Sequence, residues 1–197
     1  LEAKRILFWL FASQLGCKSK KCLLGFIDVC RAYFHALAHR KVYIRLPQED
    51  AHEGKCGKLN KAMYGTRDAA QEWDRFCGEC MCQWGFTQGK SNPCVFHHPG
   101  KDVRVVIHGD DFTVLGCIDE LDWFRKCIQS RMEVKIKARL GDSGHTRILN
   151  RIVEVNNGIM YEADQTIMGR LHVGPWGSRP KVISHLFPAH RIFPCSS

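Results

Sequence analysis

The hydrophobic residues of this chain follow two periods, and each period predicts a different type of element. Apolar runs typical of buried strands occur at residues 22–27, 42–46, 94–97, 103–107 and 112–115, and residues 133–137 alternate like a half-exposed strand. Helical spacing recurs at residues 1–15, 67–84 and 118–128. Residues 148–155 and 159–162 flank Asn156-Asn157-Gly158, a favoured hairpin turn. Helices covering an antiparallel sheet predict an α+β fold.

Two of these helices have a clear apolar face. The helix expected over residues 67–84 ends before Gly85. Its buried face is predicted to hold Trp73, Phe76, Cys77, Cys80, Met81 and Trp84. The first helix is expected to face the core with the side chains of Ala3, Ile6, Leu7, Leu10 and Phe11. Its apolar run at residues 6–12 is far shorter than the roughly 20 residues that a bilayer requires, and no convincing secretory cleavage pattern follows. We therefore expect an intracellular protein with no membrane partner.

Composition and charge narrow the range of partners. The chain has 197 residues, of which 45% are hydrophobic and 25% charged, as in globular proteins. Its formal net charge of +9 suits a polyanionic partner such as nucleic acid, because Lys and Arg gain affinity by releasing counterions from phosphates. Positive charge also serves plain solubility, so it supports a nucleic-acid partner without proving one.

The chain divides into an ordered region over residues 1–164 and a different tail over residues 165–197. The tail contains no Asp or Glu and four of the seven prolines, which interrupt helices and central strands. We hypothesise that a frameshift or a decayed reading frame begins near Gln165. The alternative is a natural proline-rich linker.

Eleven cysteines suggest two further possibilities. An odd count without a signal peptide argues against a disulfide scaffold. Cys77, Cys80 and Cys82, with His97 and His98 downstream, form a possible zinc set. Because the first two cysteines lie on the apolar face of the expected helix, we interpret them mainly as small buried side chains.

Three carboxylates lie at positions suited to a hard metal ion. Asp28 ends the apolar run at residues 22–27, and Asp110 and Asp111 follow His108-Gly109 between two strand-like runs. One Asp at a strand end and two at the turn of a neighbouring hairpin would surround divalent cations with the oxygen ligands that Mg²⁺ prefers. A short Asp-Asp turn motif also occurs for purely structural reasons, because Asp suits turns.

The segments around these carboxylates resemble the reverse transcriptase of copia-type LTR retrotransposons. Residues 28–34 resemble its Asp-Val-x-x-Ala-Phe/Tyr block, and residues 42–47 its Val-Tyr-Met-x-x-Pro strand. Residues 56–73 are similar to its Lys-Leu-x-Lys-x-Leu-Tyr-Gly-Leu-Lys-Gln-Ala-Pro-Arg-x-Trp run. Gly85-Phe86 and residues 91–96 match the next two blocks, and residues 108–111 occupy the position of Tyr-Val-Asp-Asp, with His108 in place of Tyr. Six blocks in order across residues 20–116 are a strong signal.

The resemblance implies a polymerase palm with partial fingers over residues 1–164, acting as an RNA-directed DNA polymerase. Asp28, Asp110 and Asp111 would be the catalytic residues and would hold two Mg²⁺ ions, or Mn²⁺. Tyr33, Tyr64, Gly65 and Arg67 would contact the substrates, with the Tyr33 ring excluding a ribose 2′-hydroxyl. The implied partners are an RNA or DNA template with its primer and deoxynucleoside triphosphates. The implied location is a cytoplasmic virus-like particle or the nucleus.

Two other functions remain open from the sequence. The chain is alternatively a catalytically inactive relic of such an enzyme, or a basic nucleic-acid-binding module without enzymatic activity. Primer extension separates the first from both others, and stoichiometric zinc would favour the last.

Overall fold

The computed structural model describes residues 2–13, 21–50, 52–156, 159–163 and 191–192. Its centre is a six-stranded sheet in the order β4-β5-β6-β7-β1-β8, in which every neighbouring pair is antiparallel. The strands are β1 (Leu23–Val29), β4 (Thr87–Gln88), β5 (Val95–His98), β6 (Val103–His108), β7 (Asp111–Gly116) and β8 (Val134–Leu140). Together with its helices, this sheet confirms the predicted α+β class.

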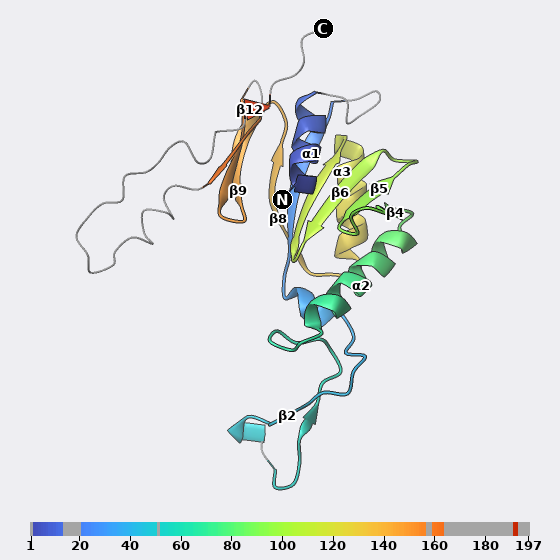
Figure 1. Cartoon of the computed structure of the whole chain (residues 1–197), viewed down its shortest axis with the longest axis vertical. Coiled ribbons are helices and arrows are strands. Elements are labelled where there is room, and N and C mark those ends of the chain that lie inside the picture. Colours follow the sequence, from blue (N-terminus) through green and yellow to red (C-terminus); the bar gives the residue numbers. More distant parts are fainter. Residues whose placement is uncertain (1, 14–20, 51, 157–158, 164–190, 193–197) are drawn as a thin grey trace, which may run out of the picture.

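A second antiparallel sheet has the order β12-β11-β10-β9 (Figure 1). Its strands are β9 (Ser143–Ile148), β10 (Arg151–Asn156), β11 (Ile159–Ala163) and β12 (Arg191–Ile192). The predicted hairpin of β10 and β11 is confirmed. The sequence did not predict β9, because its residues are mostly polar on both faces and its register is set by pairing with β10. Apart from β12, the predicted tail at residues 165–197 lies outside the described residues.

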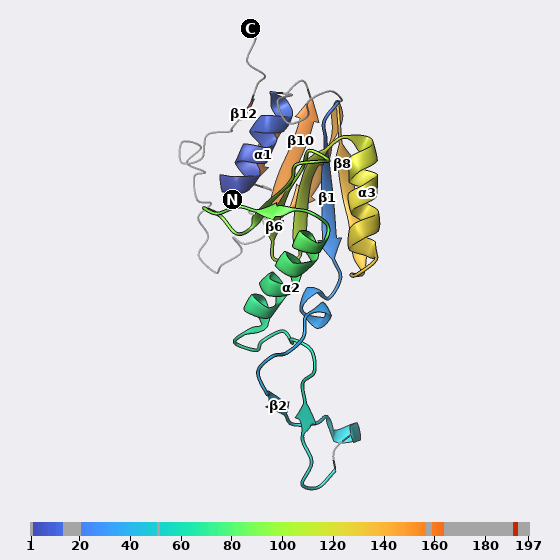
Figure 2. The ribbon, with the colours of Figure 1, turned by 90° about the vertical axis from the view of Figure 1, so that its right-hand side faces the viewer.

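Helices cover both faces of the six-stranded sheet (Figure 2). The helices α2 (Ala69–Gln83) and α3 (Ile118–Gln129) pack on one face, against Ile107, Phe112 and their neighbours. The helix α1 (Glu2–Ala12) packs on the other face, together with side chains of β9, β10 and β11. The side chains of a strand alternate between faces, so β1 contributes Ile27 to the first cluster and Phe26 to the second.

The buried faces of the helices agree with the sequence for α2 and only in part for α1. In α2, Trp73, Cys77, Cys80 and Met81 are buried as predicted, whereas Phe76 and Trp84 are only partly buried. Gly85 follows the helix with a φ of +85°. In α1, Leu7 and Phe11 are buried, but Ile6 is 61% exposed, so its predicted core position is wrong. Phe8 takes that role, because contact with both sheets buries the stripe of Lys4, Phe8 and Ala12. No helix among the described residues is long and apolar enough to cross a membrane.

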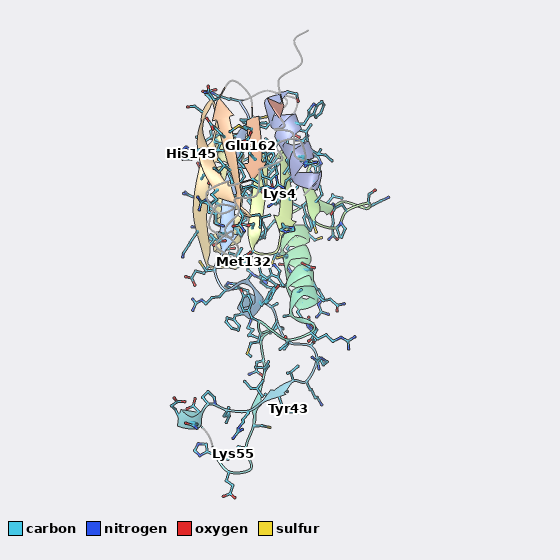
Figure 3. The ribbon with its side chains drawn as sticks, turned by 60° about the vertical axis from the view of Figure 1, so that its left-hand side comes forward. Lys4, Tyr43, Lys55, Met132, His145 and Glu162 are labelled. Carbon is cyan, nitrogen blue, oxygen red and sulfur yellow. The ribbon has the colours of Figure 1, made fainter. Side chains whose placement is uncertain are left out.

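An extended arm, which we define as residues 36–62, projects away from the sheet beyond α2 (Figure 1). Its two halves are joined near the base by the Ala62 N–H donating to the Ala36 carbonyl at 3.0 Å, and further out by the pairing of β2 (Tyr43–Ile44) with β3 (Gly57–Lys58). Tyr43 and Lys55 lie toward its far end (Figure 3). The arm has six Lys and Arg residues against three Asp and Glu residues, so it is basic.

Candidate active site

Two of the three predicted carboxylates face each other on adjacent strands. Asp28 of β1 lies directly opposite Asp111 of β7 in the antiparallel register. Their side chains are 24% and 9% exposed. Asp110 is exposed at the turn between β6 and β7, whose closing pair is His108 and Asp111. The sequence placed both adjacent carboxylates in the turn, whereas in the structure Asp111 is already the first residue of β7.

The turn that carries Asp110 is held by two hydrogen bonds from the core. The Val29 N–H at the end of β1 donates to the Asp110 carbonyl at 2.9 Å. Trp73 Nε1 of α2 donates to the Gly109 carbonyl at 2.8 Å. Gly109 has a φ of +61°, which only glycine adopts without cost and which suits a two-residue hairpin loop. Because Trp73 is only 1% exposed, the packing of α2 fixes the position of the turn.

A lysine from β8 bridges the two facing carboxylates. Lys137 Nζ lies 2.9 Å from Asp28 Oδ1 and 2.8 Å from Asp111 Oδ1. Burial alone would lower the pKa of Lys137, but the hydrogen bonds that its ammonium donates to Asp111 and Asp28 outweigh burial and raise the pKa above its ordinary value. The ammonium is therefore charged at neutral pH, and the two carboxylates converge on one cationic atom.

This convergence tests whether the residues fit a divalent metal. Carboxylate oxygens are the ligands that Mg²⁺ requires, and Asp28 and Asp111 already share one cation position. Asp110 does not join them at that point: among the described residues, no three His, Cys, Asp or Glu side chains are grouped as metal ligands. The donor chemistry of the facing pair thus fits a divalent ion, provided that Lys137 leaves the position between them.

A second lysine lies close to the same carboxylates. Lys4 of α1 is 2% exposed where the helix packs on the strands (Figure 3), and its Nζ has no hydrogen-bond partner. Burial lowers the pKa of Lys4, while the charge of Asp111 opposes that shift and the charge of Lys137 adds to it. Partial burial, and after it the positive charge of Lys4, also lowers the pKa of His108.

The residues expected to contact substrate lie where the sheet meets the arm. Tyr33 follows β1 in the short helix η1 (Ala32–His35), and its ring packs against the ring of Tyr64 with centroids 4.4 Å apart. Phe34 packs edge-on against Tyr64 at 5.6 Å. Gly65 has a φ of +86°, and both Gly65 and Arg67 are exposed just before α2. The structure thus brings Tyr33 and Tyr64 together, and the roles of all four residues stay predictions.

The cysteines of the possible zinc set do not share one surface. Cys77 and Cys80 are buried in the core beneath α2, whereas Cys82 is exposed. Burial raises the pKa of both buried thiols, which favours the protonated form over the thiolate that binds zinc. These positions support the interpretation of Cys77 and Cys80 as core residues. Cys22 is disulfide-bonded, whereas Cys77, Cys80 and Cys82 carry free thiols.

The fold and the paired carboxylates define a class of protein with an antiparallel sheet that presents acidic residues at one end. A family model described as "Reverse transcriptase (RNA-dependent DNA polymerase)" matches residues 14–144, more than half of the chain. This chain therefore belongs to the reverse transcriptase family. The family uses divalent metal ions and acts on a nucleic-acid template and primer with nucleotide substrates.

Sequence reasoning missed three residues around the site. Trp73 was assigned only to the core, although its indole N–H also holds the turn. Lys137 belonged to an alternating strand pattern that predicts a solvated side chain, and no local signal pairs it with Asp28. Lys4 was one charged residue in an amphipathic helix, and only the packing of α1 buries it beside Asp111.

Proposed function

We propose that residues 1–164 are the palm and part of the fingers of a copia-type retrotransposon reverse transcriptase, an RNA-directed DNA polymerase. The family match and the order of the six sequence blocks support this origin. The single observation that carries the activity is the convergence of Asp28 and Asp111 on one cationic position, beside the turn that presents Asp110.

Asp28, Asp110 and Asp111 would hold the divalent ions, Mg²⁺ or Mn²⁺. When bound, such ions lower the pKa of the primer 3′-hydroxyl and neutralise the charge of the leaving pyrophosphate. The chain itself positions the three carboxylates. Trp73 and Val29 hold the turn that carries Asp110, and the β1–β7 register places Asp28 opposite Asp111. Preorganised groups of this kind need no rearrangement when the charge of the transition state develops.

The surface next to the carboxylates would bind the nucleotide and the template. The packed rings of Tyr33 and Tyr64 form an aromatic surface directly after β1, suited to a sugar or base. Arg67 and the basic arm add positive charge for phosphates. The resemblance and their position at the junction of sheet and arm support a role for these residues in binding the nucleotide and the template.

The experiment is Mg²⁺-dependent primer extension by the full chain on an RNA template with a DNA primer. We expect Asp110→Asn to reduce extension by at least about 100-fold, since replacing outer-shell partners of a metal already costs about 10–100-fold. Asp142→Asn is the matched control, because Asp142 is a highly exposed carboxylate on the surface, paired with Lys21. Extension by Asp110→Asn equal to that by Asp142→Asn would refute the proposed site.

A folded wild-type chain that extends no primer would indicate the inactive relic or the nucleic-acid-binding module. Fluorescence anisotropy with a labelled RNA–DNA hybrid then separates these two. Binding that weakens steeply with salt supports the binding module, because phosphate contacts by Lys and Arg release counterions. A folded chain without binding supports the relic.

The role of Tyr33 has its own test. We expect Tyr33→Ala to lower the preference for deoxynucleotides over ribonucleotides by about tenfold, in the range that one steric contact supplies. Phe34→Ala is the control, because Phe34 also contacts Tyr64 but is 43% exposed. An unchanged preference in Tyr33→Ala would remove Tyr33 from the nucleotide site.

A further inference from the structure

Lys137 occupies the position at which the two facing carboxylates converge. Its Nζ lies within hydrogen-bond distance of one oxygen from each, at 2.9 Å from Asp28 and 2.8 Å from Asp111. Two carboxylates side by side repel unless a positive charge lies between them. In this structure, the chain itself supplies that charge.

An irregularity in β8 directs Lys137 to this position. In the pairing of β1 with β8, Phe26 lies opposite Ala138, and Ile27 lies opposite Ile136. The register therefore skips Lys137, as in a β-bulge. Bulges are frequent beside active sites, where they redirect a side chain that regular alternation would place elsewhere. The backbone of β8 thus places the Lys137 side chain at this position.

We propose that the Lys137 ammonium is an internal substitute for the divalent ion: it holds Asp28 and Asp111 together in the metal-free protein and must leave before a metal binds them. This inference rests on the proposed function, because it assumes that these carboxylates bind metal. Both cations need the same oxygen atoms, and like charges repel strongly at such distances. Lys137 has room to leave, since its side chain is 34% exposed and has a flexible four-carbon stem.

The competition has a measurable consequence for metal affinity. A site that is open in only a fraction of molecules binds its ligand more weakly by that fraction. Removing the ammonium makes the site permanently open, so the affinity for a divalent ion should rise. Lys4, whose buried charge also acts on Asp111, stays in place and does not compete for the oxygen atoms directly.

The experiment measures Mn²⁺ binding to the full chain from the electron paramagnetic resonance signal of the free ion. We expect Lys137→Met, which keeps the length of the side chain, to bind Mn²⁺ at least about tenfold more tightly than wild type. Lys137→Arg should stay close to wild type, because it keeps a cation at the same position. Lys126→Met controls for the loss of one positive charge, since Lys126 is exposed on α3, away from the two carboxylates, and it should change the affinity less than about twofold.

A second readout is thermal unfolding followed by circular dichroism. Without metal, Lys137→Met should unfold at a lower temperature than wild type, because Asp28 and Asp111 then repel. Added Mn²⁺ should raise its unfolding temperature more than that of wild type. If Lys137→Met does not fold, Lys137→Gln replaces it with the same expectations, because it keeps hydrogen-bond donors without the charge.

The outcomes separate this inference from the proposed function. Unchanged or weaker Mn²⁺ binding by Lys137→Met overturns the substitute role. If Asp28→Asn still abolishes binding in that case, the metal site itself stands. Absence of Mn²⁺ binding by wild type and Lys137→Met alike overturns both.

Discussion

Replacing Trp73 with phenylalanine removes one of the two hydrogen bonds that hold the turn carrying Asp110. Trp73 Nε1 donates to the Gly109 carbonyl at 2.8 Å, and the indole is 1% exposed beneath the sheet. Phenylalanine keeps an aromatic ring at this position, including part of the packing against Phe76, whose ring centroid lies 6.0 Å away. The substitution therefore tests the hydrogen bond and the outer part of the indole without emptying the core.

The expected cost follows from two contributions. A hydrogen bond of this kind contributes about 0.5–1.5 kcal/mol to the free energy of unfolding. The smaller ring loses the burial of about two carbon groups, at about 0.8 kcal/mol each. We expect a total loss of roughly 2–3 kcal/mol. With a urea dependence of about 1–3 kcal/mol per molar, the unfolding midpoint should fall by about 1 M or more.

The assay is urea unfolding followed by circular dichroism, because tryptophan fluorescence changes with the substitution itself. Trp84→Phe is the matched control, because Trp84 lies at the opposite, C-terminal end of α2 and does not contact the turn. Trp84 is only partly buried and packs edge-on against Phe124, so this variant should lose less than about 1 kcal/mol. Equal losses in the two variants would refute the special role of Trp73.

A local readout tests whether the turn itself loosens. The Val29 N–H donates to the Asp110 carbonyl, so its hydrogen exchange reports on the turn. In Trp73→Phe, protection of the Val29 amide should fall by at least about tenfold, the equivalent of 1.4 kcal/mol. The Gly89 amide, bonded to the Val95 carbonyl in a different hairpin, should change less. Unchanged protection at Val29 would mean that Trp73 stabilises the core without holding the turn.

Two further substitutions test the surroundings of the site. Lys4→Met should stabilise the protein by about 1–3 kcal/mol near neutral pH, because it removes a buried amine without a hydrogen-bond partner. Burial lowers the pKa of Lys4, so the native state holds this proton less tightly than the unfolded chain does. The gain in stability from Lys4→Met should therefore shrink as the pH rises toward 10.5. A gain that does not depend on pH would contradict the argument that the buried charge is the cause. Gly109→Ala should lower the free energy of unfolding by about 1–2 kcal/mol from its positive φ alone, since nothing lies within 4 Å of the added carbon. Gly78→Ala in α2, which is equally uncrowded, should instead raise it by about 0.5–1 kcal/mol. Urea unfolding measures both changes, and changes of the same sign would contradict the argument from backbone conformation.

Local patterns were sufficient for most of the fold. The spacing of Trp73, Cys77, Cys80 and Met81 predicted both the helix and its buried face, because one stripe at helical spacing has only one apolar surface to protect. Adjacent hairpins were equally readable from apolar runs around turn residues. The strand β9 escaped prediction because its pairing with β10, rather than its own composition, makes it a strand.

The sequence by itself determined the elements, the family resemblance and the identity of the three carboxylates. It did not determine which of them meet: the antiparallel register places Asp28 opposite Asp111 and leaves Asp110 at the exposed turn. Only the tertiary structure brings Lys137 between the facing pair, and it does so through a register shift between strands far apart in the chain. Local periodicity reflects which side chains leave water, whereas the electrostatics of a site depend on distances between segments that no local pattern contains.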